Sequence, residues 1–152
     1  MEEKIKIIEK LGRDLLTKLQ IPAETEVKSD GRSILLDIEL PDPGILIGRA
    51  GQTLSDFQYL LRIMVNRKLG DFTYLTVDVN NYRQRQKDQI EQEVVQAIRL
   101  VKTTQRSQIL SPMPPANRRV VHILVKEEDE LETESVGQDP NRRVLIKVSQ
   151  EE

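Results

Sequence analysis

Hydrophobic positions follow two spacings along this chain. Where they recur every three or four residues, one face of a helix is apolar; where they alternate with polar positions, one face of a strand is buried. The segments with helical spacing are residues 4–20, 52–69, 80–104 and 116–126. The segments with an alternating or β-rich pattern are residues 23–28, 33–40, 71–79, 107–110, 131–136 and 142–148. The pattern therefore predicts an α+β protein.

The order of these elements divides the chain into two halves. Residues 1–79 have the order α-β-β-α-α-β when the short apolar stretch 44–47 is counted as a helix. The second half has the order α-(β)-α-β-β. Because Asn80 and Asn81 can cap the helix that follows them, little linker separates the halves. We expect two small α/β sandwich-like domains, residues 1–79 and 80–152, packed together or semi-rigidly joined.

The apolar stripes of these elements predict the two cores. The first core is expected to hold Ile8, Leu11, Leu15, Leu19, Ile34, Leu36, Ile38, Leu40, Leu54, Phe57, Leu61, Met64, Leu75, Val77 and Val79. The second is expected to hold Ile90, Val94, Ala97, Ile98, Val101, Val120, Val121, Leu124, Val125, Val144, Ile146 and Val148. A chain of 152 residues is long enough to bury such cores without disulfides.

Composition narrows the chemistry that the chain can perform. It has no cysteine and one histidine, His122, which excludes thiolate metal sites and cysteine nucleophiles and leaves no His-rich metal cluster. We therefore expect no metal and no cofactor. No apolar window approaches 18 residues and the N-terminus is charged, so we expect a cytoplasmic protein without a membrane segment.

Charge is unevenly distributed along the chain. The formal net charge is −2, yet residues 83–122 hold eight basic and three acidic side chains. A milder basic excess covers residues 43–70. Ordinary solvated helix faces can account for such runs. They also fit a phosphate-binding surface, because affinity for phosphate depends on the charges close to the contact.

The loop Gly48-Arg49-Ala50-Gly51 is the first candidate site. Glycines at both ends allow a tight turn and a close approach of the backbone to a ligand. Its amides and the start of the next helix suit a phosphodiester backbone, to which Arg49 adds a charge. A GxxG string by itself is equally typical of a plain turn between helices.

Arg118 and His122 form the second candidate site. Four residues apart, they share one face of a predicted helix. Arg118 offers a planar fork of donors for a phosphate, and the His122 ring offers stacking and a switchable donor. The opposing interpretation is that His122 is a satisfied, partly buried residue.

The sequence around each motif supports a binding role for it. The order α-β-β-α-GxxG-α-β, with Ile45, Leu46 and Ile47 before the loop, resembles the type II KH domain, in which the loop clamps about four nucleotides. The second half resembles the R-three-H domain, a single-strand-binding domain named for its Arg-x-x-x-His motif. The residues that carry this likeness are Ser111-Pro112-Met113, Arg118-Arg119-Val120-Val121-His122, Glu132-Thr133-Glu134-Ser135, Pro140 and Arg142-Arg143-Val144. The pair of domains is similar to the bacterial Jag, or KhpB, family of RNA-binding proteins linked to cell elongation and division.

This resemblance covers about residues 1–148 and implies where RNA is bound. The implied contacts are Gly48, Arg49, Ala50 and Gly51 in the KH loop, then Arg118 and His122, with Arg119, Arg142 and Arg143 as further phosphate contacts. It also implies a groove between the loop and the strand 33–40. Ala50 departs from the basic or polar residue expected there. Many family members begin with a separate N-terminal module, whereas this sequence starts at the KH helix, so the likeness does not extend to that module.

Catalysis is disfavoured, and a second binding function competes with the first. The chain has no G-x-S-x-G nucleophile elbow, and Arg49-Ala50 stand where a P-loop needs Lys-Ser/Thr. Its partner is expected to be single-stranded RNA, with single-stranded DNA left open. The alternative is a protein-interaction scaffold in which the KH half pairs with a small single-domain KH protein and nucleic acid is secondary.

Overall fold

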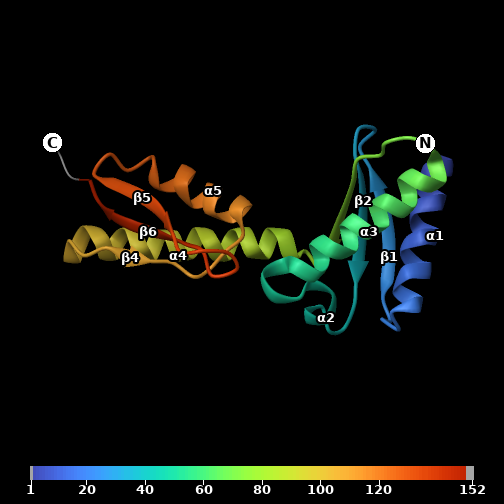
Figure 1. Cartoon of the computed structure of the whole chain (residues 1–152), viewed down its shortest axis with the longest axis horizontal. Coiled ribbons are helices and arrows are strands. Elements are labelled where there is room, and N and C mark those ends of the chain that lie inside the picture. The colour runs from blue at the N-terminus through green and yellow to red at the C-terminus, as the bar shows by residue number, and fades with distance from the viewer. Residues whose placement is uncertain (1, 150–152) are drawn as a thin grey trace. The chain divides into compact units, whose positions relative to one another are not determined.

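The computed structural model describes residues 2–149 and divides the chain into two compact units, Met1–Arg83 and Gln84–Glu152 (Figure 1). Unit 1 contains α1 (Glu2–Lys18), β1 (Glu24–Ser29), β2 (Ile34–Glu39), α2 (Gly44–Ile47), the 3₁₀ turn η1 (Arg49–Gly51), α3 (Gln52–Leu69) and β3 (Leu75–Val79). Helix α4 (Tyr82–Thr104) begins at the end of unit 1, and most of it lies in unit 2. Unit 2 continues with β4 (Gln108–Ile109), α5 (Pro115–Val125), β5 (Leu131–Val136) and β6 (Arg143–Val148).

A three-stranded sheet in the order β1-β2-β3 forms the frame of unit 1. Strands β1 and β2 are an antiparallel hairpin, and β3 pairs with β2 in parallel. Helices α1 and α3 cover one face of this sheet, as expected when every second residue of β2 and β3 is apolar (Figure 1). The other face carries the polar residues of the same strands.

The core of unit 1 follows the predicted stripes with two differences. Val65, rather than Met64, is fully buried on α3, and Met64 is only partly buried. The predicted stripe advanced by three residues where the helix needed four to stay on its buried face. Leu19 is 51% exposed because α1 ends at Lys18, one residue before it.

The junction at Asn80 and Asn81 differs from the predicted helix cap. Both residues have positive φ angles, and the Asn80 side-chain amide pairs with the backbone N–H and carbonyl of Leu40. The Asp78 carboxylate instead accepts a hydrogen bond from the Arg83 amide in the first turn of α4. Asn80 therefore fastens the end of β2 beside the end of β3.

Unit 2 is built on an antiparallel sheet in the order β4-β6-β5. Its core combines one stripe of α4, one of α5 and the inward residues of β6. The buried members are Ile90, Val94, Ala97, Val101, Leu110, Met113, Val121, Val125, Leu131, Val144 and Ile146. Ile98, Val120, Leu124 and Val148, which the sequence placed in the core, pack against it partly buried.

The predicted fold class and element order are confirmed. Both halves show the predicted succession of helices and strands, including the short strand at residues 108–109. Within residues 2–149, no helix is both long enough and apolar enough to cross a membrane. Across the same residues, no group of three or more His, Asp or Glu side chains could hold a metal ion.

Candidate nucleic-acid interface

The glycine loop forms one tight turn between α2 and α3. Gly48 and Gly51 have φ angles of 70° and 79°, and Ala50 between them has φ 50° and ψ 28°. All three residues thus adopt positive φ, which glycine tolerates and alanine adopts only at a cost of about 1–2 kcal/mol. The loop holds one strained residue.

Close contacts also require both glycines. A Cβ atom on Gly48 would lie 2.0 Å from the Thr53 Oγ1, and one on Gly51 would lie 3.0 Å from the ring of Tyr82. No larger side chain fits at Gly48 unless Thr53 moves. The glycines therefore let the backbone close onto α3 on one side and onto Tyr82 on the other.

Helix α3 starts directly after this loop, and its first amide, that of Gln52, donates to the Arg49 carbonyl. No side-chain hydrogen bond caps the helix, and its first turn contains no acidic residue. Unpaired N–H groups at a helix N-terminus and the positive end of its dipole favour an anion. Arg49 and Ala50 are exposed, and Ile45 is 59% exposed whereas Ile47 is buried. Ile45 can therefore contact a base, while Ile47 belongs to the core.

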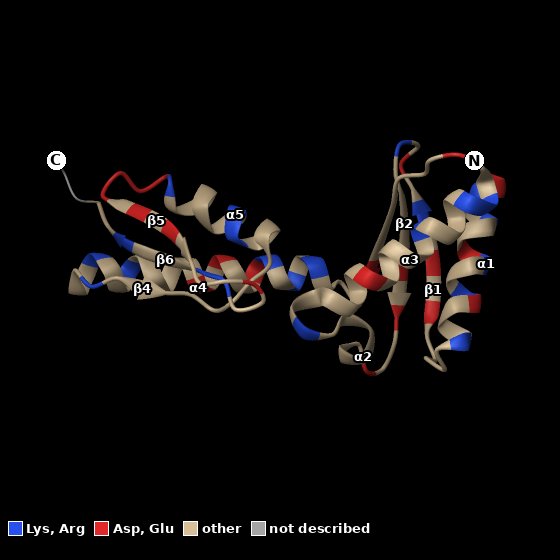
Figure 2. Cartoon of the chain, in the orientation of Figure 1, with Lys and Arg blue, Asp and Glu red and all other residues tan. Residues whose placement is uncertain are grey.

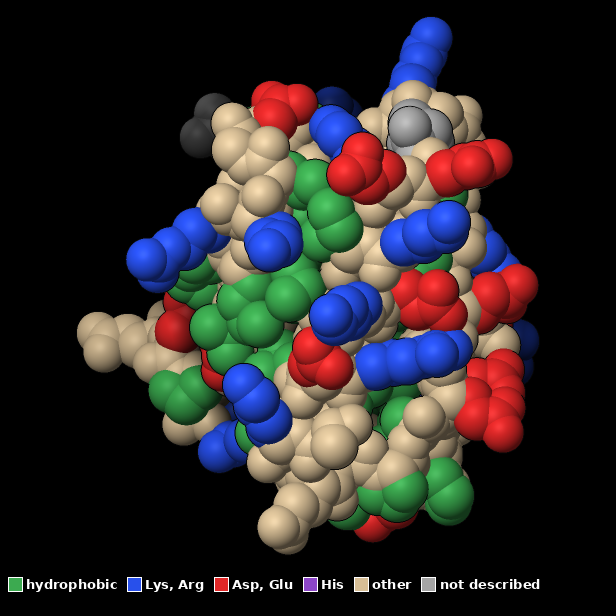
Figure 3. All heavy atoms as spheres, turned by 90° about the vertical axis from the view of Figure 1, so that its right-hand side faces the viewer, with side chains coloured by type: hydrophobic (Ala, Val, Ile, Leu, Met, Phe, Trp, Pro, Cys, Tyr) green, Lys and Arg blue, Asp and Glu red, His purple; other side chains and the backbone are tan. Residues whose placement is uncertain are grey.

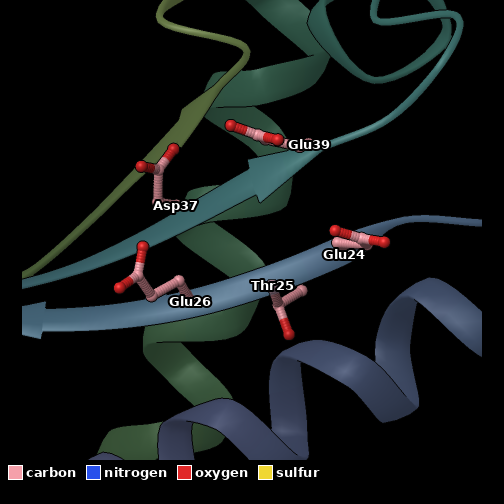
Figure 4. A pocket seen from close by; sticks show the side chains of 5 residues that line it. All are labelled: Glu24, Thr25, Glu26, Asp37 and Glu39. Atoms are coloured by element: carbon pink, nitrogen blue, oxygen red, sulfur yellow. The ribbon is translucent and has the colours of Figure 1, made fainter.

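The open face of the unit 1 sheet is acidic, which argues against part of the expected groove. A pocket of about 170 Å³ on this face is lined by Glu24, Thr25, Glu26, Asp37 and Glu39 (Figure 4). Lys28 donates hydrogen bonds to Asp37 and also pairs with Glu26, and these carboxylates raise the pKa of Lys28 above its ordinary value. Four carboxylates line this pocket and Lys28 pairs with two of them, so the pocket repels phosphate.

Arg118 is buried, contrary to the expectation of an exposed fork. Only 6% of the residue is exposed, and its Nη1 donates to the Met113 carbonyl at 2.8 Å and to the Asp139 Oδ1 at 3.1 Å. These bonds tie α5 to the segment before it and to the loop between β5 and β6. Arg118 is therefore first a structural residue, and its direct contact with RNA stays a prediction.

Both ring nitrogens of His122 have protein partners. Nδ1 lies 2.7 Å from the Thr133 Oγ1 and Nε2 lies 3.0 Å from the Ser135 Oγ, both on β5. A neutral imidazole can donate to one hydroxyl and accept from the other. The ring is thereby fixed against the sheet of unit 2, partly buried, so its polar atoms are used within the fold.

The other predicted arginines differ in exposure. Arg119 is exposed on α5, while Arg142 and Arg143 are partly buried. The Arg143 Nε donates to the Asn141 carbonyl, and the buried Arg142 Nε has no hydrogen-bond partner. Figure 2 shows Lys and Arg on the loop after α2 and along the first turns of α4, and acidic residues along β1 and β5. In the described part of unit 2, Arg119 is thus the most accessible of the predicted contacts.

Sequence reasoning missed the partners of these residues. Asp139 is far from Arg118 along the chain, and Tyr82 is far from Gly51, so no local spacing signals either pair. Tyr82 also lies just beyond the predicted domain boundary at residue 79, and it packs against the core of unit 1. The signal available in the sequence was an aromatic residue, Tyr82, three positions after the end of β3.

The comparisons with known proteins agree with this two-part organisation. Residues 6–79 match the family model described as the KH domain of KhpA/KhpB, and residues 86–148 match that of the R-three-H domain. An RNA-binding protein KhpB from Clostridium symbiosum is 33% identical over 133 residues, which is 88% of this chain and 60% of the relative. That from Bacillus subtilis (strain 168) is 28% identical, covering 93% of this chain and 74% of the relative.

The chain belongs to the Jag/KhpB family. It spans 60% of the length of the Clostridium symbiosum relative, and 42% of a KhpB from Lactiplantibacillus plantarum that is 26% identical to it. The expected resemblance is therefore confirmed over most of this chain.

Proposed function

We propose that this chain binds single-stranded RNA without catalysing a reaction, and that the GxxG loop of unit 1 is the main contact. The observation that carries the proposal is the loop itself, in which two glycines at positive φ bring an exposed Arg49 beside the uncapped start of α3. Such a turn suits a phosphodiester backbone, because amides and the helix dipole act together. The names of the relatives, which are RNA-binding proteins, support the same function.

Unit 2 contributes a second, more modest contact in this proposal. The exposed Arg119 meets a phosphate, and Arg142 and Arg143, where β6 begins, are further phosphate contacts. Arg118 and His122 hydrogen-bond α5 to Met113, Asp139 and β5, and so maintain the conformation of the surface that carries Arg119. The role that the family suggests, post-transcriptional regulation linked to cell elongation and division in the cytoplasm, is part of the proposal.

A protein partner is a second candidate, favoured by an apolar surface on unit 1. On α3, Tyr59, Leu60 and Ile63 are 65%, 46% and 46% exposed, and they share one side of the helix. Seen from the α1 side, hydrophobic side chains gather in a patch bordered by Lys and Arg (Figure 3). Exposed apolar patches of this kind mark protein interfaces. The partner proposed for this face is a small single-domain KH protein.

A salt-dependent binding titration tests the RNA proposal. Fluorescently labelled single-stranded RNA of mixed sequence is titrated with the parent chain and with a variant carrying Arg49→Asp and Ala50→Asp. Aspartate tolerates the positive φ at position 50, so the fold is expected to persist. We expect affinity at least tenfold weaker for the variant, and a steep loss of parent affinity as salt rises.

Leu60→Asp provides the matched control on the apolar face. It should leave RNA affinity within about twofold of the parent, since exposed surface changes act locally. A double-aspartate variant that remains folded and binds RNA like the parent would contradict the proposal. An RNA affinity lost in the Leu60→Asp chain and retained in the loop variant would place the RNA contact on the apolar face of α3 instead of on the loop.

A further inference from the structure

The first turn of α4 is fastened to the loop end of unit 1 by two neighbouring side chains. Tyr82 packs partly buried against the core of unit 1, and its ring and hydroxyl lie where a Cβ on Gly51 would meet them at 3.0–3.4 Å. Gly51 is also the residue that immediately precedes α3. Tyr82 therefore lies against the backbone that the proposed RNA clamp uses.

Arg83 holds the same turn from its other side. Its Nη2 donates to the Gln58 Oε1 at 3.0 Å, and its Nε and Nη2 both lie 3.3 Å from the Val77 carbonyl. The Gln58 Oε1 also accepts from the Val77 amide at 2.8 Å. Because β3 is an edge strand, Val77 has backbone groups that its sheet does not pair. Gln58 and Arg83 satisfy them and anchor α4 to α3 and β3.

We propose that Tyr82 is a positioning residue for the GxxG loop, held in place by Arg83 and Gln58. The Tyr82 ring supports Gly51 in its positive-φ conformation and so fixes the direction of the loop amides. The clamp of the KH half therefore depends on a side chain beyond the last KH strand, at the start of the next helix. This inference rests on the proposed RNA binding by the loop.

Substitutions at Tyr82 in the full chain separate positioning from folding. Tyr82→Leu keeps an apolar side chain in the core but removes the flat ring, whereas Tyr82→Phe keeps the ring. We expect Tyr82→Leu to weaken binding of a labelled single-stranded RNA about tenfold and Tyr82→Phe to bind within twofold of the parent. Tyr74→Leu, the same change at a tyrosine that is 71% exposed and lies just before β3, is the control and should leave affinity unchanged.

Chemical shifts of the loop and a Gln58→Leu variant provide two further tests. Cα carbon chemical shifts of residues 49–52, which report backbone φ and ψ, should move in Tyr82→Leu and stay near parent values in Tyr82→Phe, which loss of stability alone does not produce. Gln58→Leu removes no charge yet frees Arg83 and Val77, so it should weaken binding several-fold even if Tyr82→Leu fails to fold.

Parent-like affinity and parent-like loop shifts in folded Tyr82→Leu would overturn the inference, as would equal losses for the leucine and phenylalanine variants. Parent-like affinity in Gln58→Leu would overturn the anchoring role of Arg83 and Gln58. A parent chain that binds no RNA would overturn the proposed function instead, and the loop shifts would then still report whether Tyr82 supports Gly51.

Discussion

The two motifs of this chain occupy opposite kinds of environment. The GxxG loop exposes Arg49 and Ala50, holds that alanine at positive φ and leads into a helix start without a side-chain cap. The Arg118–His122 pair lies against the sheet of its unit, with hydrogen bonds to Met113, Asp139, Thr133 and Ser135. Buried polar groups with partners stabilise a fold, whereas unsatisfied, exposed backbone groups can still bind a ligand. The two motifs look equally functional in the sequence. Substitution in the loop should therefore weaken RNA binding, whereas substitution at Arg118 or His122 should lower the stability of unit 2.

The probes available in this chain can report the two units separately. All three tyrosines, Tyr59, Tyr74 and Tyr82, lie in residues 1–83, and residues 84–152 contain no Tyr, Trp or Phe. Tyrosine fluorescence therefore follows unfolding of unit 1 alone, while far-ultraviolet circular dichroism follows both units. This separation makes each of the following substitutions informative.

The largest effect is expected for Arg118→Ala. The change removes a buried side chain and the partner of the Met113 carbonyl, so the free energy of unfolding of unit 2 should fall by about 2–3 kcal/mol. Urea denaturation should show an earlier circular dichroism transition and an unchanged tyrosine transition. Arg119→Ala, on the neighbouring exposed residue, should leave both transitions unchanged and reduce the log-log salt slope of RNA binding by about 0.7. Equal stability of the two variants would contradict a structural role for Arg118.

Gly48→Ala should act on both stability and binding. The added Cβ would clash with Thr53, and alanine would have to adopt the φ of 70° that Gly48 has. We therefore expect the free energy of unfolding of unit 1 to fall by about 2 kcal/mol and RNA binding to weaken at least tenfold. Gly70→Ala is the control, because Gly70 has φ 67° and no atom within 4 Å of the added Cβ. Both changes carry the cost of positive φ, and only Gly48→Ala should impair RNA binding. Comparable losses of RNA affinity for the two variants would contradict a specific role of the GxxG loop in RNA binding.

His122→Ala should destabilise unit 2 less than Arg118→Ala does. Its two partners are neutral hydroxyls that water can replace, so we expect a loss of about 1–2 kcal/mol, seen by circular dichroism and not by tyrosine fluorescence. Ile123→Ala, on the exposed side of α5, should lose much less. RNA affinity measured where both variants are folded should match the parent. A stable His122→Ala that binds RNA weakly would instead make the ring a direct contact.

Ala50→Gly is expected to have the smallest effect, with the opposite sign. Glycine relieves the positive-φ strain but adds disorder to the unfolded chain, so unit 1 should gain at most about 1 kcal/mol. Tyrosine fluorescence during urea denaturation measures this gain. A loss of stability would show that the alanine methyl group makes a favourable contact in the loop.

The sequence predicts the frame of each unit better than it predicts the partners within it. The periodicity of apolar residues locates the helices and strands, because each of them buries one face. Gly70 ends α3 at positive φ, as its position in the sequence indicated. The sequence pattern does not predict a side chain's hydrogen-bond partner when that partner lies in a distant segment of the chain. Asn80 suggests a helix cap by position but pairs with Leu40, and Arg118 suggests a surface fork but meets Asp139. Short-range pattern contains no information about such pairs.

The most direct test of this contrast is a nuclear magnetic resonance titration of the isotope-labelled chain with single-stranded RNA. We expect the largest shifts at the backbone amides of residues 49–54, with small shifts for the Arg118 guanidinium and the His122 ring. Large, saturating shifts of the Arg118 and His122 side chains together with unmoved loop amides would contradict it.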